Sequence, residues 1–332
     1  MGGPGMTRSG GSGAGVVLFG DGKWAADTLR RLVRSRHRVA GVVLRRRPSD
    51  GQLEAAAREA GLPVLQPDRA DDPGFIAQVG ALEPDLVVSV AYDQILRRSL
   101  REVPRLGCLN AHAGALPRYR GRNVINWAII NGECEIGVTV HQIDDGIDTG
   151  DVVLQQMLPI AWTDTYGDVL ARVVEAIPPL VERAVDQVAE GSASPRAQDH
   201  AAATYCGGRS DGDEWLDWAL PSERVHNLVR GISRPGPGAR TTRDGVPVTI
   251  WKAYYDPAWP AYLGTPGQVV GRNGAGVVVK TGDSTILLQE IEAAGGPTGV
   301  PAWPIGTRLG GNVAHDLRAV LRRLDALESR KG

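Results

Sequence analysis

The chain has 332 residues, enough for one large domain and a smaller one. Its 37 basic and 38 acidic residues give a formal net charge of -1, so we expect no nucleic-acid partner, because a basic surface is what holds a phosphate backbone. No apolar run approaches the roughly 20 residues that cross a bilayer, and three widely spaced cysteines disfavour disulfides and metal, so we expect no membrane segment and no metal site.

Residues 1–14 are rich in Gly and Ser and lack the apolar centre of a signal peptide. We therefore expect a disordered leader on a cytoplasmic protein. Apolar runs then alternate with helical patterns. The predicted strands are 15–20, 39–44, 62–65 and 85–90, and the predicted helices follow residue 22 and span 53–61 and 75–82. This alternation predicts an α/β domain with a doubly wound, Rossmann-like, mostly parallel sheet.

The same domain is expected to continue to residue 200. Its later elements are a strand at 107–110, a helix at 123–131, strands at 137–143 and 151–158, and a long helix at 166–190. Pro178 and Pro179 predict a kink or break of that helix near Ile177, because proline lacks the amide hydrogen and crowds the preceding turn.

The linker-like segment 191–195 precedes a second domain, predicted at 201–311. A short helix is expected at 222–232 with Ser222 as its N-cap. Strand candidates separated by Gly-rich turns follow at 248–253, 267–270, 276–280 and 285–291. They predict a small, OB-like β-barrel. Residues 312–332 are expected to form a C-terminal tail, amphipathic and helical over 313–328.

The segment Gly20–Ala25 matches a dinucleotide-binding GxGxxA pattern after a strand, and Arg45–Arg47 could hold a 2′-phosphate. An NADP-dependent oxidoreductase is therefore a distant alternative. Two features argue against this alternative: the third motif position is Ala, and the bulky Trp24 would hinder close approach of a pyrophosphate. The two glycines of the pattern also simply permit a tight turn.

Asn110 and His112 lie two residues apart at the end of a predicted strand, so both side chains point to the same side. An amide donor beside an imidazole suits acyl transfer, because Asn can stabilise an oxyanion while His moves a proton. Asp148, on a Gly-flanked loop, could orient that imidazole. The residues alone equally allow a turn-forming and packing role for Asn110 and His112, with Asp148 capping its loop. Cys108 is expected to be an inert, buried thiol.

The segment from Cys108 to Leu158 contains, in order, N-x-H, L-P-x-Y-R-G, W-x-x-x-N-G-E, G-V-T-x-H and G-x-D-x-G-D. In this it resembles the 10-formyltetrahydrofolate-dependent formyltransferases, and the resemblance covers roughly residues 15–295. It implies an N-formyltransferase that uses N10-formyltetrahydrofolate, with Asn110, His112 and Asp148 as its catalytic residues. Two features depart from the family: Gly114 replaces a common Ser, and residues 295–311 match no pattern.

The resemblance also implies ligand contacts. Those expected for the folate are Val88, Ser89, Val90, Tyr92, Ile95, Leu96, Asp144 and Gly146, and those expected for the acceptor are Tyr119, Arg120, Gly121 and Trp127. The segments that hold the acceptor residues resemble sugar N-formyltransferases, so the expected acceptor is the amine of a small molecule, a nucleotide-linked amino sugar. The alternatives are a hydroxyornithine-type siderophore precursor and methionyl-tRNA. The sequence leaves open whether the chain forms a homodimer.

Overall fold

The computed structural model describes residues 13–293, 295–311 and 321. The predicted C-terminal tail, except Leu321, and residues 1–12 of the predicted leader lie outside the described residues. The last two leader residues belong to the fold. Ala14 is buried and its N–H lies 3.1 Å from Nδ1 of His37, a buried side chain.

The chain divides into two compact units that are interleaved in sequence. Of the described residues, the first unit holds 13–124, 135–159 and 170–208, and the second holds 125–134, 160–169, 209–293, 295–311 and 321. The sequence prediction placed one boundary after residue 200. The second unit instead takes two short segments from inside the predicted first domain.

The first unit is built on a seven-stranded sheet with the order β3-β2-β1-β4-β5-β7-β8. Its strands are β1 (Gly15–Gly20), β2 (Arg38–Leu44), β3 (Val64–Leu65), β4 (Leu86–Val90), β5 (Cys108–His112), β7 (Glu135–Gln142) and β8 (Val152–Pro159). The first five strands are parallel to one another, and β7 and β8 are antiparallel additions. The predicted doubly wound, mostly parallel sheet is confirmed.

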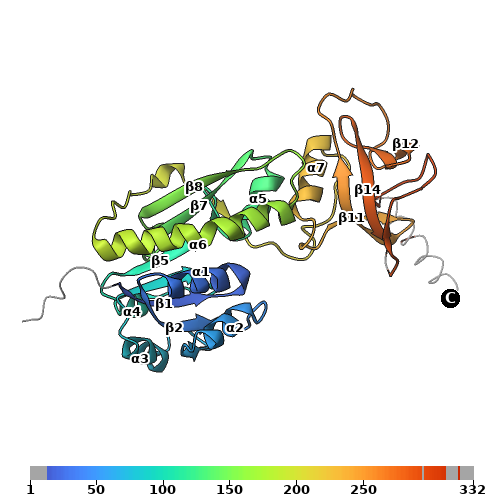
Figure 1. Ribbon diagram of the computed structural model, residues 1–332. Coiled ribbons are helices and arrows are strands. Elements are labelled where there is room, and N and C mark those ends of the chain that lie inside the picture. The colour runs from blue at the N-terminus through green and yellow to red at the C-terminus, as the bar shows by residue number, and fades with distance from the viewer. Residues whose placement is uncertain (1–12, 294, 312–320, 322–332) are drawn as a thin grey trace, which may run out of the picture. The chain divides into compact units, whose positions relative to one another are not determined.

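Helices cover both faces of this sheet (Figure 1). They are α1 (Gly22–Arg34), α2 (Gln52–Glu59), α3 (Pro73–Ala81), α4 (Arg98–Arg101) and α6 (Tyr166–Glu190). Phe75 of α3 and Leu100 of α4 share one apolar cluster with Val17 and Phe19 of β1. On the other face, α1 and α6 lie side by side, joined by the Arg31–Glu182 ion pair. The sheet is thus the middle of three layers.

The long helix α6 stays α-helical through Pro178 and Pro179, so it does not break near Ile177, and a kink there stays a prediction. Its apolar residues around the prolines are deeply buried, with Ile177 at 1%, Leu180 at 2% and Val181 at 0% exposure. Packing of this face outweighs the two backbone hydrogen bonds that the prolines cannot donate.

The second unit contains the helices α5 (Val124–Ile130) and α7 (Ser222–Gly231) and a six-stranded antiparallel sheet. Its strands are β10 (Ala239–Arg243), β11 (Val246–Tyr254), β12 (Val269–Asn273), β13 (Gly276–Lys280), β14 (Thr285–Ala293) and β15 (Thr298–Gly299). Ile130 of α5 and Val225 of α7 belong to the core cluster of this unit. That shared core explains why α5 groups with the second unit.

The segment 307–310 lies between the two edge strands of this sheet. Leu309 donates its N–H to Gly267 O (2.8 Å) beside β12, and Gly310 donates to Thr242 O of β10 (2.8 Å). Isolated bridges pair Arg243 with Leu309 and Gln268 with Arg308. Residues 307–310, which belong to the segment that matched no family pattern, therefore link the edge strands of the β-rich domain.

Helix α7 begins one residue earlier than a Ser222 N-cap would give. Pro221 is the N-cap and Ser222 is the first helical residue. Asp283 Oδ1 accepts hydrogen bonds from the N–H (2.8 Å) and hydroxyl (2.9 Å) of Ser222. A distant carboxylate thus supplies the acceptor that we expected from Ser222 itself.

Three short elements complete the described structure. Strands β6 (Arg120–Gly121) and β9 (Tyr205–Cys206) form a small parallel pair, and η1 (His200–Ala202) is a 3₁₀ turn. Gly121 is required in this pair, because its φ is +96° and a Cβ would lie 2.3 Å from Cys206 O. Within the described residues, every helix is too short or too polar to cross a membrane.

Candidate active site

Asn110 and His112 occupy the carboxyl end of β5, beside the carboxyl end of β4. Asp148 lies on the loop between β7 and β8, with a left-handed backbone (φ 54°). Its Oδ2 is 3.6 Å from His112 Nδ1. The structure therefore brings together His112 and Asp148, which are far apart in the sequence, at the sheet edge where ligands of open α/β folds bind.

Backbone and side-chain contacts hold Asp148 in place. Its Oδ2 accepts the N–H of Gly121 (2.8 Å), and its carbonyl accepts Gln198 Nε2 (2.9 Å). Gln198 also donates to Gly150 O (2.6 Å). The sequence suggested no role for Gln198, which fastens both ends of the Asp148 turn.

The substrate contact predicted for Arg120 stays a prediction, and the structure gives its side chain buried protein partners. Arg120 is only 2% exposed, and its guanidinium bonds Gln198 Oε1 (2.7 Å) and Tyr205 Oη (2.8 Å) and lies 3.0 Å from His200 Nδ1. These three partners come from a segment about 80 residues away. Arg120 thus supports Gln198 and, through it, the Asp148 turn.

The ring of His112 is held from both sides. Nε2 lies 2.7 Å from the carbonyl oxygen of Tyr119, which can only accept, so Nε2 carries a hydrogen. In the neutral ring the proton-accepting atom is then Nδ1, which faces Asp148. This tautomer suits a base whose protonated form is stabilised by a neighbouring carboxylate.

Gly114 explains how the ring fits against Tyr119. A Cβ at position 114 would lie 2.6 Å from His112 Nε2 and 2.4 Å from Tyr119 O. Both distances are far inside van der Waals contact. The absence of a side chain here, where the related family commonly has Ser, lets the His112–Tyr119 hydrogen bond form.

Burial and neighbouring charges tune the two ionisable groups. Burial lowers the pKa of His112 below its usual 6.5, and the Asp148 carboxylate and the Tyr119 carbonyl offset part of this. Burial alone would raise the pKa of Asp148. The nearby rings of His141 and His112 and the Gly121 N–H outweigh it and lower the pKa to about 2. Asp148 is therefore ionised at neutral pH.

A cavity of about 130 Å³ joins Asn110 and Asp148 to the predicted folate site. Its lining includes Asn110 and Asp148 together with six of the eight residues expected to contact folate: Ser89, Tyr92, Ile95, Leu96, Asp144 and Gly146. Val88 and Val90 do not line it, because both are fully buried within β4. Only their backbone could take part, and it is already paired with β1 and β5.

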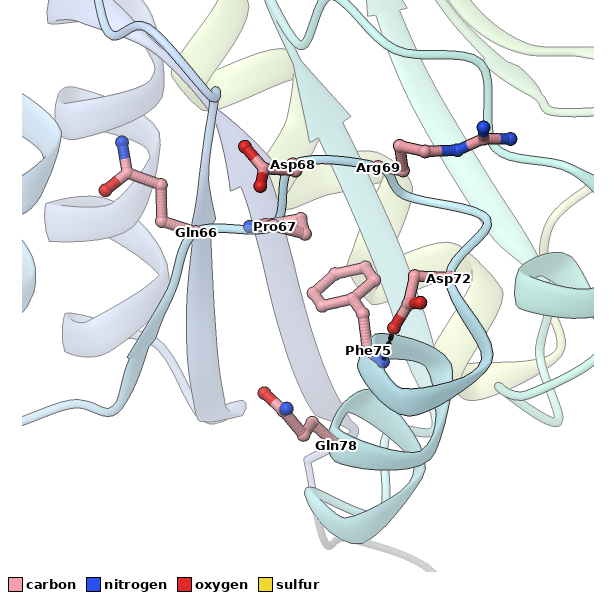
Figure 2. Close-up of a pocket in the computed structure, with 7 residues that line it drawn as sticks. All are labelled: Gln66, Pro67, Asp68, Arg69, Asp72, Phe75 and Gln78. Atoms are coloured by element: carbon pink, nitrogen blue, oxygen red, sulfur yellow. Dashed lines mark hydrogen bonds between the residues drawn. The ribbon is translucent and has the colours of Figure 1, made fainter.

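A second cavity of the first unit, of about 330 Å³, contains none of the predicted site residues (Figure 2). Its charged groups already have partners. Asp72 accepts the N–H of Phe75 (2.8 Å), Asp68 pairs with Arg46 (3.0 Å) and Arg69 pairs with Asp71 (3.0 Å). We assign it no ligand.

The dinucleotide interpretation is not supported. Asp21, at the start of α1, is 3% exposed and its carboxylate accepts the N–H of Ser49 (2.9 Å) and pairs with Arg45 Nη1 (3.2 Å). A buried carboxylate therefore sits where a pyrophosphate would bind. Arg45 also donates to Ala91 O (2.6 Å), so its guanidinium already has protein partners where a 2′-phosphate was considered.

The remaining predicted residues are placed as follows. Tyr119 and Gly121 contribute backbone groups, to His112 and Asp148 respectively. Trp127 belongs to the second unit, where it packs against that unit's core, so its contact with an acceptor stays a prediction. Burial raises the pKa of the Cys108 thiol to about 12, which agrees with an inert cysteine. No cluster of metal-ligating side chains occurs among the residues described.

Comparison with known proteins decides the family. A model of the formyl transferase family matches residues 16–185, and a model of the formyl transferase C-terminal domain matches residues 210–300. The methionyl-tRNA formyltransferase of Geobacter metallireducens is 34% identical over 292 residues, covering 86% of this chain and 92% of that protein. That of Geobacter sulfurreducens is 34% identical over 322 residues, covering 92% and 100%.

The chain belongs to the formyl transferase family. It is a folate-dependent formyltransferase, as the sequence motifs implied.

Solved structures share the fold at lower identity. An N-formyltransferase from Helicobacter canadensis, in complex with folinic acid and dTDP-3-aminofucose, has a TM-score of 0.65 at 18% identity, covering 83% of this chain and 99% of that one. HypX from Aquifex aeolicus, in complex with tetrahydrofolic acid, has a TM-score of 0.61 at 19% identity, covering 89% and 49%. These likenesses establish the fold of this formyltransferase.

The acidic limb of the pH profile of kcat/KM is expected to lie below pH 6.5. If neutral His112 accepts the proton, its lowered pKa keeps the active form populated at pH values where an exposed histidine would be charged. We would measure kcat/KM from pH 5 to 9. Asp148→Asn should move the limb to lower pH, since the carboxylate raises the pKa of His112. A limb above pH 7 would contradict the assignment.

Gly114→Ala is expected to lower kcat by about 10- to 100-fold, because the Cβ displaces the His112 ring from Tyr119 O. Folate affinity should change little. The matched control is Gly51→Ala, where a Cβ meets no atom within 4 Å. Unchanged kcat in Gly114→Ala would show that the ring position seen here is not required for turnover.

Proposed function

We propose that this formyltransferase transfers the formyl group of N10-formyltetrahydrofolate to the amino group of methionyl-tRNA. The observation that carries the proposal is the identity of 32–34% to methionyl-tRNA formyltransferases over 84–92% of the chain. It extends through the second unit as well as the catalytic one. The sugar N-formyltransferase noted above is 18% identical and supports only the fold. Our first expectation of an amino-sugar acceptor is therefore replaced by its alternative.

The proposed chemistry uses three side chains. The amine nitrogen attacks the formyl carbon, and the carbonyl oxygen takes up negative charge. Asn110 donates an N–H to that oxygen, which in comparable sites contributes about 3 to 4 kcal/mol. His112 Nδ1 accepts the proton that the amine loses, and the ionised Asp148 stabilises the resulting imidazolium.

The intermediate then collapses as the bond between the formyl carbon and N10 breaks. His112 returns its proton to N10, so the products are the formylated amine and tetrahydrofolate, and the enzyme regains its starting protonation state. A covalent intermediate on the enzyme is not needed. Exclusion of water from the small cavity would protect the activated formyl group from hydrolysis.

A groove of about 920 Å³ on the second unit offers chemistry suited to a polynucleotide. Trp215 (43% exposed) and Arg308 line it beside Asp217 and Asp244. An exposed indole stacks on bases, and an arginine pairs with phosphate. The mixed signs agree with the net charge of -1, so we expect binding that relies on stacking as well as charge.

The test supplies N10-formyltetrahydrofolate with four acceptors in parallel and follows tetrahydrofolate release. They are methionyl-tRNA, deacylated tRNA, nucleotide-linked amino sugars and hydroxyornithine. Turnover with methionyl-tRNA alone is the expected result, since deacylated tRNA lacks the amine. Turnover with an amino sugar and none with methionyl-tRNA would overturn the proposed acceptor and keep the chemistry.

A further inference from the structure

His141 lies inside the site, although the motif analysis gave it no role. It sits on β7 directly across from Asn110 on β5 and is 2% exposed. Its Nε2 is 3.2 Å from Asn110 Nδ2 and 3.5 Å from Asp148 Oδ1. The second distance exceeds the roughly 2.7–3.2 Å of an N–H···O hydrogen bond, so Asn110 is the closer partner.

The other ring nitrogen fixes the tautomer. Nδ1 of His141 lies 2.7 Å from the carbonyl oxygen of Gln142. A carbonyl can only accept, so Nδ1 carries the hydrogen, and in the neutral ring Nε2 presents a lone pair. That lone pair accepts one N–H of Asn110.

This hydrogen bond selects the orientation of the Asn110 amide. If the amide were turned over, its Oδ1 would face the lone pair of Nε2, and two acceptors would oppose each other. In the favoured orientation one N–H is used by His141. The second N–H of the same planar group diverges from the first and remains available as a donor on the cavity side.

We propose that His141 is a positioning residue: its Nδ1–H tautomer holds the Asn110 amide so that Asn110 offers a hydrogen, rather than a carbonyl oxygen, to the oxygen of the formyl group. The inference rests on the oxyanion-binding role proposed for Asn110. His141 lines the same cavity as Asn110, and the role proposed for it is exerted through Asn110.

Two amide variants separate this role from a purely structural one. His141→Gln places an amide where Nε2 lies, so its Oε1 still accepts from Asn110. His141→Asn places an amide where Nδ1 lies, so it keeps only the bond to Gln142 O. We expect His141→Asn to lower kcat by about 10- to 100-fold with unchanged folate KM, and His141→Gln to recover most of it. A structural role predicts the reverse order.

A double-mutant cycle gives the second test. In an Asn110→Ala background, His141→Asn should lower kcat by less than about threefold, because the group that it positions is gone. Full additivity of the two losses would overturn the proposal, and so would equal losses in His141→Gln and His141→Asn. Melting temperatures of all variants establish whether each is folded.

The tautomer of His141 can be read in the wild-type protein without an acceptor, from long-range ¹H–¹⁵N correlations of its ring. Protonated Nδ1 with unprotonated Nε2 is expected, and a doubly protonated ring or the opposite tautomer at pH 7.5 would overturn the inference. Absence of wild-type turnover with methionyl-tRNA would instead count against the proposed acceptor, and the cycle would then be measured with the acceptor that is turned over.

Discussion

Replacing His112 by alanine is expected to lower kcat by about 10²- to 10⁴-fold, which corresponds to about 3 to 5 kcal/mol of transition-state stabilisation. The reason is that His112 Nδ1 is the proton acceptor proposed for the attacking amine. Folate binding should remain measurable by fluorescence titration, because His112 does not line the small cavity that holds the predicted folate contacts.

Exogenous imidazole provides the control for His112→Ala. The substitution leaves a space the size of the missing ring, and imidazole in solution should restore part of the lost turnover. Rescue that grows with the unprotonated fraction of the imidazole would support a base. Loss of folate binding in a folded His112→Ala protein would contradict the role assigned to His112.

Asp148→Asn is expected to lower kcat by a comparable factor, about 10²- to 10⁴-fold, because the charge that stabilises the His112 imidazolium is removed. The variant isolates that charge, since an amide oxygen can still accept the Gly121 N–H and keep the turn. Steady-state kinetics at saturating folate and acceptor would measure the loss.

The matched control is Asp145→Asn. It lies three residues away on the same loop, with its side chain 89% exposed and paired with Arg101. Its effect on kcat should be less than about twofold, as expected of an exposed ion pair. Equal losses in both variants would mean that the loop as a whole responds to lost charge, and would contradict a specific role for Asp148.

The sequence predicted the framework well where the signal is local. The strand at 276–280 was predicted with its observed bounds, and that at 15–20 likewise, because each is a short apolar run that begins with glycine. Strand β10 was missed because its sequence, Ala-Arg-Thr-Thr-Arg, shows little apolar character. The continuity of α6 across two prolines depends on packing, which no local pattern reveals.

The same distinction applies to the site. Asn110 and His112 were found because they lie two residues apart at a strand end. The contact between Asn110 and His141 depends on the register of β5 against β7, which the spacing of these two residues does not determine. Arg120 was expected to contact substrate because its neighbours in sequence resemble an acceptor segment. Its actual partners, such as Gln198 and Tyr205, are near it only in the folded chain.

The interleaving of the two units also affects how the chain folds as it is synthesised. Ile130 of α5 belongs to the same core as Val225 of α7, which is made 95 residues later (225 − 130). At about 5 to 20 residues per second, this apolar face of α5 stays uncovered for roughly 5 to 20 seconds. The nascent chain therefore exposes an apolar helix face during translation. A ribosome-associated chaperone that binds exposed apolar segments would act on the chain during that interval.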